Sequence, residues 1–422
     1  MTARQATHTR LLLAALLAMV LLSCKHDNME YGVDFSQLPT NGRSFVPYHE
    51  QDCDLDSAPL AALPGRRNAS SIDGVALLRG MTEGLTASSV HQVSGTYQSV
   101  DSWGRPLTLS GAVYYPQNRP LKGIIVSSHY TVGADFEVPS NTCFMDAWLA
   151  TKDYAIVMPD YMGYGASADS VHPYMQADLT AHHILDMALA VRTFFAARNI
   201  TILNPDIILI GYSQGAHASV HAMRMLENPQ MYPEYADSKL HISRCCVGGG
   251  PYYISSFFQR CVNNNYIGIP CSVPLLVLGM NVGQTGDDVF DPAFYFSPRT
   301  LENYRDWIVS KRYTVDQLNN IIGTGRLDKI LTDEACDLSH PETARFYNTL
   351  LRHDVPRDFV PKAPLLIFHS TGDDVVPIYN ARRLQQQLAE NKAADVTCDF
   401  GDYGVHGMAY ARFLLKLYNE LP

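Results

Sequence analysis

The residues at 211–215 read Gly-Tyr-Ser-Gln-Gly, which places a serine between two glycines. An apolar run at 207–210 precedes this pentapeptide, and a stretch with helical periodicity follows it at 216–226. A serine on a tight turn between a strand and a helix has its hydroxyl pushed out above the edge of the sheet, and flanking glycines allow the close backbone approach that such a turn needs. Ser213 is therefore a candidate nucleophile.

A serine hydroxyl is a weak nucleophile and requires a base and an orienting acid. A short strand pattern at 363–368 leads into two adjacent aspartates, Asp373 and Asp374, and a last strand pattern at 396–400 leads into a loop with His406. His406 is the only histidine after Asp373, so the order Ser, Asp, His leaves one candidate base; alone, it would be read as a loop histidine bonded to backbone. One of the two aspartates is expected to be an ordinary turn or cap residue, and we favour Asp373 as the acid.

These segments resemble the α/β-hydrolase superfamily, in which the serine turn is joined by an acid loop and a late histidine loop. The acid loop here is HSTGDDVVP at 369–377, and the histidine loop is GVHG at 404–407. The resemblance implies that the acid is Asp373. Ser370 departs from the superfamily pattern, because a glycine usually stands in its place.

Two further segments resemble the secretory lipase branch of that superfamily and its carboxylesterase relatives. The first is MPDYMGYG at 158–165 with HPY at 172–174, and the second is IIVSSHYTVG at 124–133. The resemblance extends over residues 90 to 418. It implies a carboxylic ester hydrolase with an acyl-enzyme intermediate.

Acyl transfer needs two backbone amides that stabilise the oxyanion of the tetrahedral intermediate. Gln214 follows the candidate nucleophile directly and supplies one amide. The second is expected from the turn after the early strand, at Tyr130 or Thr131. Tyr130 stands where the family usually has a glycine, so the choice between these two residues stays open.

Cofactor chemistry is not indicated by the sequence. Phosphate-binding loops, dinucleotide fingerprints and paired Cys-x-x-Cys motifs are missing from the 422 residues. His217 and His221 are four residues apart on a helical stretch and could face one metal, but no third ligand accompanies them, and packed histidines are the preferred interpretation. No cofactor and no metal is expected.

The amino terminus resembles a bacterial lipoprotein signal. Arg4 and Arg10 precede an apolar run at 11–22, which is too short for a comfortable membrane span and ends beside Ser23 and Cys24. Cys24 would become the lipidated first residue, so that the chain would be tethered to a membrane of the bacterial cell envelope, facing the periplasm or the cell exterior. A plain secretory signal or an anchoring helix is the alternative.

Composition fits an exported catalytic unit, with 46% hydrophobic and 18% charged residues. A formal charge of -10 without basic clusters argues against nucleic acid as a partner. Cysteines other than Cys24 number eight, and an oxidising compartment would let them pair; Cys261 and Cys271 bracket a short loop and could form a bridge, whereas Cys245 and Cys246 fit buried apolar positions.

Alternating strand and helix patterns predict an α/β fold, a mostly parallel doubly wound sheet. A hairpin is expected at 90–100 and 107–115, and further strands near 124–128, 155–158, 206–210, 243–248, 364–369 and 395–400. The predicted organisation is a signal peptide at 1–23, a tether and loosely ordered lead-in at 24–70, a core at 71–251 and 361–422, and an inserted helical cap at 252–360. A connection as long as the last one must have structure of its own.

The expected function is hydrolysis of a small-molecule or lipid acyl ester. Ser213 would attack, His406 would carry the proton and Asp373 would orient the imidazole. An exported serine peptidase on the same fold is one alternative, and a noncatalytic surface binding protein is a more distant one.

Overall fold

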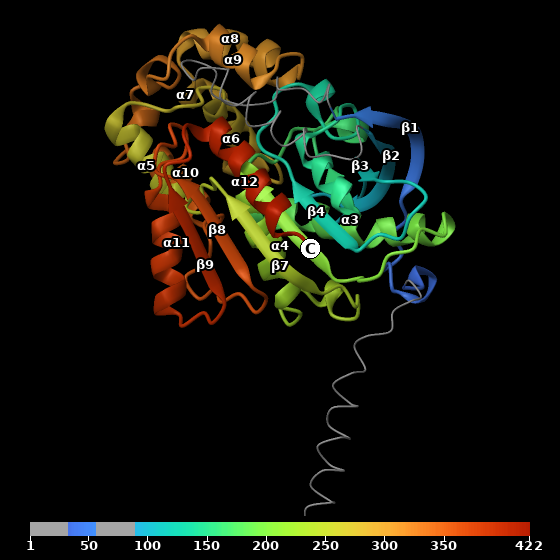
Figure 1. Ribbon diagram of the computed structural model, residues 1–422. Coiled ribbons are helices and arrows are strands. Elements are labelled where there is room, and N and C mark those ends of the chain that lie inside the picture. The colour runs from blue at the N-terminus through green and yellow to red at the C-terminus, as the bar shows by residue number, and fades with distance from the viewer. Residues whose placement is uncertain (1–32, 56–88) are drawn as a thin grey trace, which may run out of the picture.

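The computed structural model describes residues 33–55 and 89–422. Its strands form one nine-stranded sheet in the order β1-β2-β3-β5-β4-β6-β7-β8-β9 (Figure 1). The strands are β1 Val46–Asp54, β2 Ser89–Val100, β3 Pro106–Tyr115, β4 Gly123–Ser128, β5 Tyr154–Pro159, β6 Ile207–Tyr212, β7 Ile242–Gly248, β8 Leu365–Ser370 and β9 Val396–Gly401.

The sheet has an antiparallel end and a parallel end. At one end, β1 pairs antiparallel with β2, β2 with β3, and β3 with β5. From β5 onward the neighbours β5, β4, β6, β7, β8 and β9 pair parallel. Parallel neighbours need crossover helices, and these cover both faces of the sheet. The helices are α3 Ala177–Ala197, α4 Gln214–Glu227, α5 Ile254–Asn264, α6 Ser272–Met280, α7 Pro292–Tyr295, α8 Pro298–Tyr304, α9 Val315–Ile322, α10 Pro341–Leu351, α11 Tyr379–Glu390 and α12 His406–Glu420.

The apolar strands supply two cores because successive side chains point to opposite faces. Val126 of β4 packs in one core with α3, α4 and α11, whereas its neighbour Ile125 packs in the other with α12 and the 3-10 segment Met145–Lys152. The predicted α/β-hydrolase arrangement, a mostly parallel doubly wound sheet, is confirmed.

Strand β1 lies inside the segment 24–70, for which the sequence predicted only a tether and a loosely ordered lead-in. It pairs with β2 from Val46 to Asp54. As an edge strand it needs only one neighbour, and its side chains Val46 and Tyr48 are 58% and 55% exposed. Such a strand carries little apolar periodicity, which explains why the pattern did not reveal it.

A disulfide joins Cys53 of β1 to Cys143, with the two Cα atoms 5.8 Å apart. The suggested bridge between Cys261 and Cys271 is wrong, because both are free and buried in the core of the inserted segment. Cys261 lies within α5 and Cys271 immediately precedes α6. Short separation in sequence therefore did not bring the two thiols together.

Helices α5 to α10 all fall within residues 252–360 and have a hydrophobic core of their own. They gather at one end of the sheet, over the ends of β7 and β8 (Figure 1). We call residues 252–360 the cap. Across residues 33–55 and 89–422, every helix is too short or too polar to cross a membrane.

Candidate active site

Ser213 occupies a strained turn between β6 and α4. Its backbone has φ 57° and ψ -121°, a combination that side-chain-bearing residues rarely adopt. The N–H of Ser213 donates to the carbonyl oxygen of Gly248 at 2.9 Å, which fixes the turn against the end of β7. The serine predicted as nucleophile is thus held at the carboxyl edge of the parallel strands.

The two flanking glycines are required by space. A Cβ on Gly211 would lie 2.2 Å from the carbonyl oxygen of Gly215, and a Cβ on Gly215 would lie 1.8 Å from that of Ser128. Any side chain at these positions would push the turn apart. Gly215 also brings the start of α4 directly against the chain that leaves β4.

His406 and Asp373 lie together as the sequence predicted. His406 Nδ1 and Asp373 Oδ2 are 2.7 Å apart, and both side chains are fully buried. Asp373 Oδ1 accepts the backbone N–H groups of Val375 at 2.9 Å and Val376 at 2.8 Å. Burial alone would raise the pKa of Asp373, but the adjacent His406 and these hydrogen bonds outweigh it and lower the pKa. The ionised carboxylate therefore accepts the Nδ1–H of His406.

Asp374 has a different task from its neighbour. Its Oδ1 accepts the backbone N–H of His406 at 3.1 Å and does not reach the imidazole. Asp373 thus orients the ring, whereas Asp374 holds the start of α12, on which the ring is mounted. The structure thus distinguishes the two adjacent aspartates, both of which the sequence offered as the acid, with Asp373 favoured.

The loop of His406 is tied to the residue before Ser213. The hydroxyl of Tyr212 donates to the carbonyl oxygen of His406 at 2.8 Å, and the two ring centroids are 5.0 Å apart. Nε2 of His406 is buried and has no hydrogen-bond partner in the described parts of the chain. The ring is thus bonded through Nδ1, while Nε2 is left without a partner among the described residues.

Gly215, which follows Gln214, packs against Ser128 and His129, the residues just before Tyr130 and Thr131. Among the residues that the structure describes, the backbone N–H groups of Gln214, Tyr130 and Thr131 donate to no protein acceptor. The Tyr130 ring is buried in the core, 5.3 Å from the ring of Tyr410, so its bulk points away from the turn. Both Tyr130 and Thr131 remain candidates for the second donor.

Two histidines near these residues were not predicted to act. His172 Nε2 lies 2.8 Å from the side-chain nitrogen of Gln214. His369 Nε2 lies 2.8 Å from the carbonyl oxygen of Val376 and 3.6 Å from Asp373 Oδ2. The His172 contact joins distant parts of the chain, and the His369 contact depends on the orientation of its ring. Spacing in the sequence therefore gave no signal for either, beyond the HPY and HST motifs.

His217 and His221 lie side by side on α4 with ring centroids 4.6 Å apart. His217 Nε2 donates to the carbonyl oxygen of His353 at 2.7 Å. In the part of the chain that the structure covers, no three His, Cys, Asp or Glu side chains gather so that they could hold a metal. Cys24, the predicted lipidation site, lies outside the described residues.

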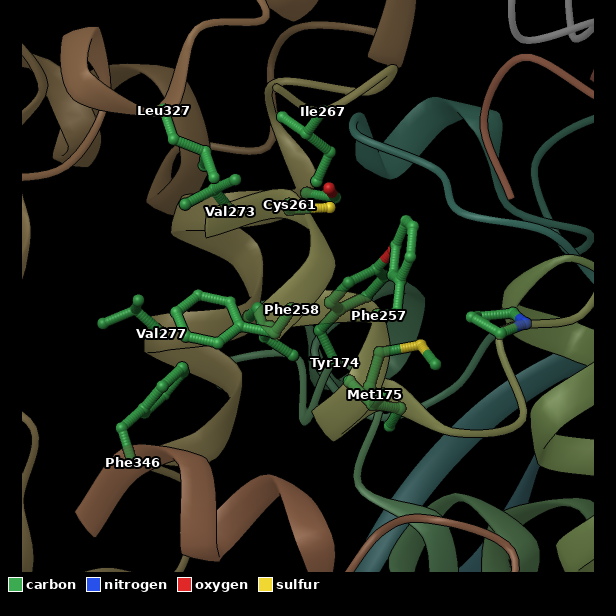
Figure 2. A pocket seen from close by; sticks show the side chains of 14 residues that line it. Tyr174, Met175, Phe257, Phe258, Cys261, Ile267, Val273, Val277, Leu327 and Phe346 are labelled. Atoms are coloured by element: carbon green, nitrogen blue, oxygen red, sulfur yellow. The ribbon is translucent and has the colours of Figure 1, made fainter. Parts of the chain in front are cut away.

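An apolar cavity of about 50 Å³ lies between the cap and the segment before α3. Figure 2 shows side chains of α5 and α6 around it, together with Tyr174 and Met175. Pro251, which follows the end of β7, forms part of the wall. The cavity therefore begins close to the strand that supports the Ser213 turn.

The chain was compared with known families and proteins. Residues 134–280 match the secretory lipase family. The sequence matches no curated protein.

Solved structures resemble the chain over most of its length. A protein from Legionella pneumophila shares 20% identity over 89% of this chain and 97% of its own, with a TM-score of 0.71. The rice cell wall degrading esterase LipA from Xanthomonas oryzae shares 18% identity over 90% of this chain and 95% of its own, with a TM-score of 0.67. Lipase A from Candida antarctica, in its closed state, shares 15% identity over 90% of this chain and 81% of its own, with a TM-score of 0.55. The chain therefore has the α/β-hydrolase fold, and its resemblance is to the secretory lipases and their esterase relatives.

Proposed function

We propose that the protein is an exported serine hydrolase that cleaves carboxylic esters through an acyl-enzyme intermediate. The observation that carries this proposal is the strained turn of Ser213, whose neighbour Tyr212 bonds to His406, together with the buried pair of His406 and Asp373. A serine nucleophile needs a base with an unpaired ring nitrogen, which here is Nε2 of His406. It also needs an acid that orients that ring, which here is the ionised carboxylate of Asp373. The match to the secretory lipase family supports ester as the substrate bond.

The reaction follows the usual two halves of acyl transfer. His406 takes the hydroxyl proton as Ser213 Oγ attacks the ester carbonyl, and returns it to the alcohol oxygen as the carbon–oxygen bond breaks. Water then attacks the acyl-serine with His406 again as base, which releases the acid and restores Ser213. Gln214 and the turn of Tyr130 and Thr131 would donate backbone N–H groups to the oxyanion in both halves.

The acyl group would enter the cavity under the cap. Its wall is apolar, with Phe257 and Phe258 from α5 and Val273 and Val277 from α6. About 50 Å³ holds three to five water-sized groups at roughly 10–15 Å³ each. Short acyl chains are therefore the favoured substrates, and long chains would require the lining side chains to move.

Export is supported by the disulfide between Cys53 and Cys143, because such bonds persist in oxidising compartments. We further propose that Cys24 carries a lipid that tethers the enzyme to a membrane of the bacterial envelope. The active site would then face the periplasm or the exterior, where it would meet small or lipid acyl esters.

The deciding experiment is hydrolysis of p-nitrophenyl esters from two to sixteen acyl carbons by the purified chain, with Ser213→Ala as its control. We expect activity that is greatest for short acyl groups and that the alanine variant lacks. Equal rates for both proteins across the series would refute ester hydrolysis at Ser213. Activity on aminoacyl or prolyl amides alone would favour a peptidase, and failure of a fluorophosphonate to label Ser213 would favour a binding protein.

A further inference from the structure

Residues 172–176, which lead into α3, contact three parts of the site at once. His172 reaches Gln214, Tyr174 reaches Thr131, and Gln176 reaches the cap. We propose that His172 and Tyr174 are positioning residues that hold the two sides of the oxyanion hole, and that this segment joins the hole to α6. The inference rests on the proposed function, because it assigns a role in acyl transfer.

The bond between His172 and Gln214 has a defined direction. His172 Nδ1 lies 2.8 Å from the carbonyl oxygen of Met162, which can only accept, so Nδ1 carries the proton. Nε2 is then a lone-pair acceptor, and the amide nitrogen of Gln214 donates to it at 2.8 Å. This chain of bonds fixes the side chain of the residue whose backbone N–H would face the oxyanion.

Burial lowers the pKa of His172 to about 3. The ring therefore stays neutral at the pH values at which an ester hydrolase works, and its acceptor nitrogen is kept. The backbones of Gly163 and His172 pack closely, because a Cβ on Gly163 would lie 2.6 Å from the His172 backbone, and the His172 side chain is buried. The support of Gln214 is thus built into a fully packed region.

Tyr174 supports the opposite side. Its hydroxyl and Thr131 Oγ1 are 2.9 Å apart, and both residues are buried. Since Thr131 follows Tyr130 on the turn after β4, this contact limits how far the turn can move. The same segment therefore holds both peptide groups from which the oxyanion donors would come.

The segment is also fastened to the cap. The amide nitrogen of Gln176 donates to the carbonyl oxygens of Gly279 at 2.8 Å and Val282 at 2.7 Å. A Cβ on Gly279 would lie 2.5 Å from the backbone nitrogen of Tyr174, so α6 packs directly on the segment. Tyr174 and Met175 also line the apolar cavity (Figure 2). An acyl group in that cavity would therefore press on the residues that position the oxyanion hole.

The test uses His172→Met, His172→Gln and Tyr174→Phe in the full chain. Methionine removes the acceptor, whereas glutamine returns an acceptor oxygen near the position of Nε2. We expect His172→Met to lower kcat for p-nitrophenyl butyrate about tenfold with little change in KM, since loss of a whole oxyanion donor costs roughly 10²–10³. His172→Gln should recover most of that loss, and Tyr174→Phe should lower kcat severalfold.

A double-mutant cycle identifies the route of the effect. Gln214→Met keeps the backbone N–H and removes the side-chain amide that bonds to His172. If His172 acts through that amide, His172→Met should change kcat less than about twofold in the Gln214→Met background. The control for losing a buried hydroxyl is Tyr97→Phe. The Tyr97 hydroxyl donates to the carbonyl oxygen of His183, away from the site.

Phosphonylation of Ser213 by a fluorophosphonate is measured on the same variants, with thermal unfolding to compare their folding. Slower phosphonylation in His172→Met than in His172→Gln, at similar melting temperature, would support the positioning role. If the wild type is phosphonylated and its variants react at the same rate, the positioning role is overturned and the proposed function is not. An unreactive wild type would overturn both this role and the proposed function.

Discussion

Asp374 bonds to the backbone of His406, and not to its ring: Asp374 Oδ1 accepts the His406 N–H at 3.1 Å, while Nδ1 belongs to Asp373. Two adjacent carboxylates thus hold one histidine at two different atoms. The ring is oriented by one residue and its helix by the next.

These two contacts predict unequal effects of the same substitution. Asp373→Asn should lower kcat by about 10⁴, because the amide stabilises the wrong imidazole tautomer. Asp374→Asn should lower kcat by less than about tenfold, because an amide oxygen still accepts a backbone N–H. Steady-state kinetics on one short ester measure both. Equal losses would show that the two carboxylates share one role.

Filling the cavity should change acyl preference. Val277→Phe places a ring in a space that the acyl chain would use, and each excluded methylene is worth about 0.8 kcal/mol, or roughly fourfold in kcat/KM. We expect at least a tenfold loss for the hexanoate ester and less than about threefold for the acetate. Val309→Phe, at a 43% exposed position of the cap, is the matched control. A uniform loss across chain lengths would place the acyl group elsewhere.

Stability should fall in mild acid because of buried histidines. Burial lowers the pKa of His183 to about 3, whereas an unfolded histidine has a pKa of about 6.5. Between these values the unfolded chain binds a proton that the folded chain refuses, so stability is full above pH 6.5 and declines toward pH 3. Burial likewise lowers the pKa to about 3 or about 4 at His129, His172, His217 and His353.

His183→Gln tests this dependence away from the active site. Removing one such histidine should reduce the slope of unfolding free energy against pH by up to about 1.4 kcal/mol per unit between pH 6.5 and 4. Urea unfolding at several pH values provides the slope. Parallel curves for variant and wild type would contradict the prediction.

The disulfide should hold the edge of the sheet. Replacing Cys53 and Cys143 with alanine opens a loop with a sequence separation of 90, and loss of a native bridge typically costs about 2–5 kcal/mol. We expect a lower melting temperature that added reductant does not lower further. Cys336→Ser, at a free cysteine, should behave as the wild type does with and without reductant.

Lipidation predicts a single modified position. Cells that express the chain should incorporate radiolabelled palmitate into it, and Cys24→Ala should abolish the label. The alanine variant should also leave the detergent phase in a phase-partition assay, because one lost acyl anchor removes about 0.8 kcal/mol per buried methylene. A wild-type chain without label would indicate a plain secretory signal.

Features set by local pattern were predictable from the sequence. Ser213 sits where a strand pattern meets a helix pattern, and the parallel strands are continuous apolar runs, so both emerge from neighbouring residues. Strand β1 was not predicted, since an edge strand with an exposed Val46 and Tyr48 lacks that pattern.

Long-range geometry was beyond such patterns. The partner of Cys53 is Cys143, far along the chain, and not a cysteine of a short loop. The contact of His172 with Gln214 likewise depends on how the segment before α3 folds over the start of α4. Chain order did lead to His406 and Asp373, because each follows its own predicted strand.

The approach of Gly215 to Ser128 has a consequence for how such an enzyme can diversify. With a Cβ at Gly215 only 1.8 Å from a carbonyl oxygen, no substitution can widen or narrow the gap between the start of α4 and the turn after β4 in small steps. The spacing between the proposed oxyanion donors is therefore a fixed quantity in any lineage that keeps this turn. New substrates must be acquired through the cap, whose side chains can change one at a time while the reacting centre stays the same.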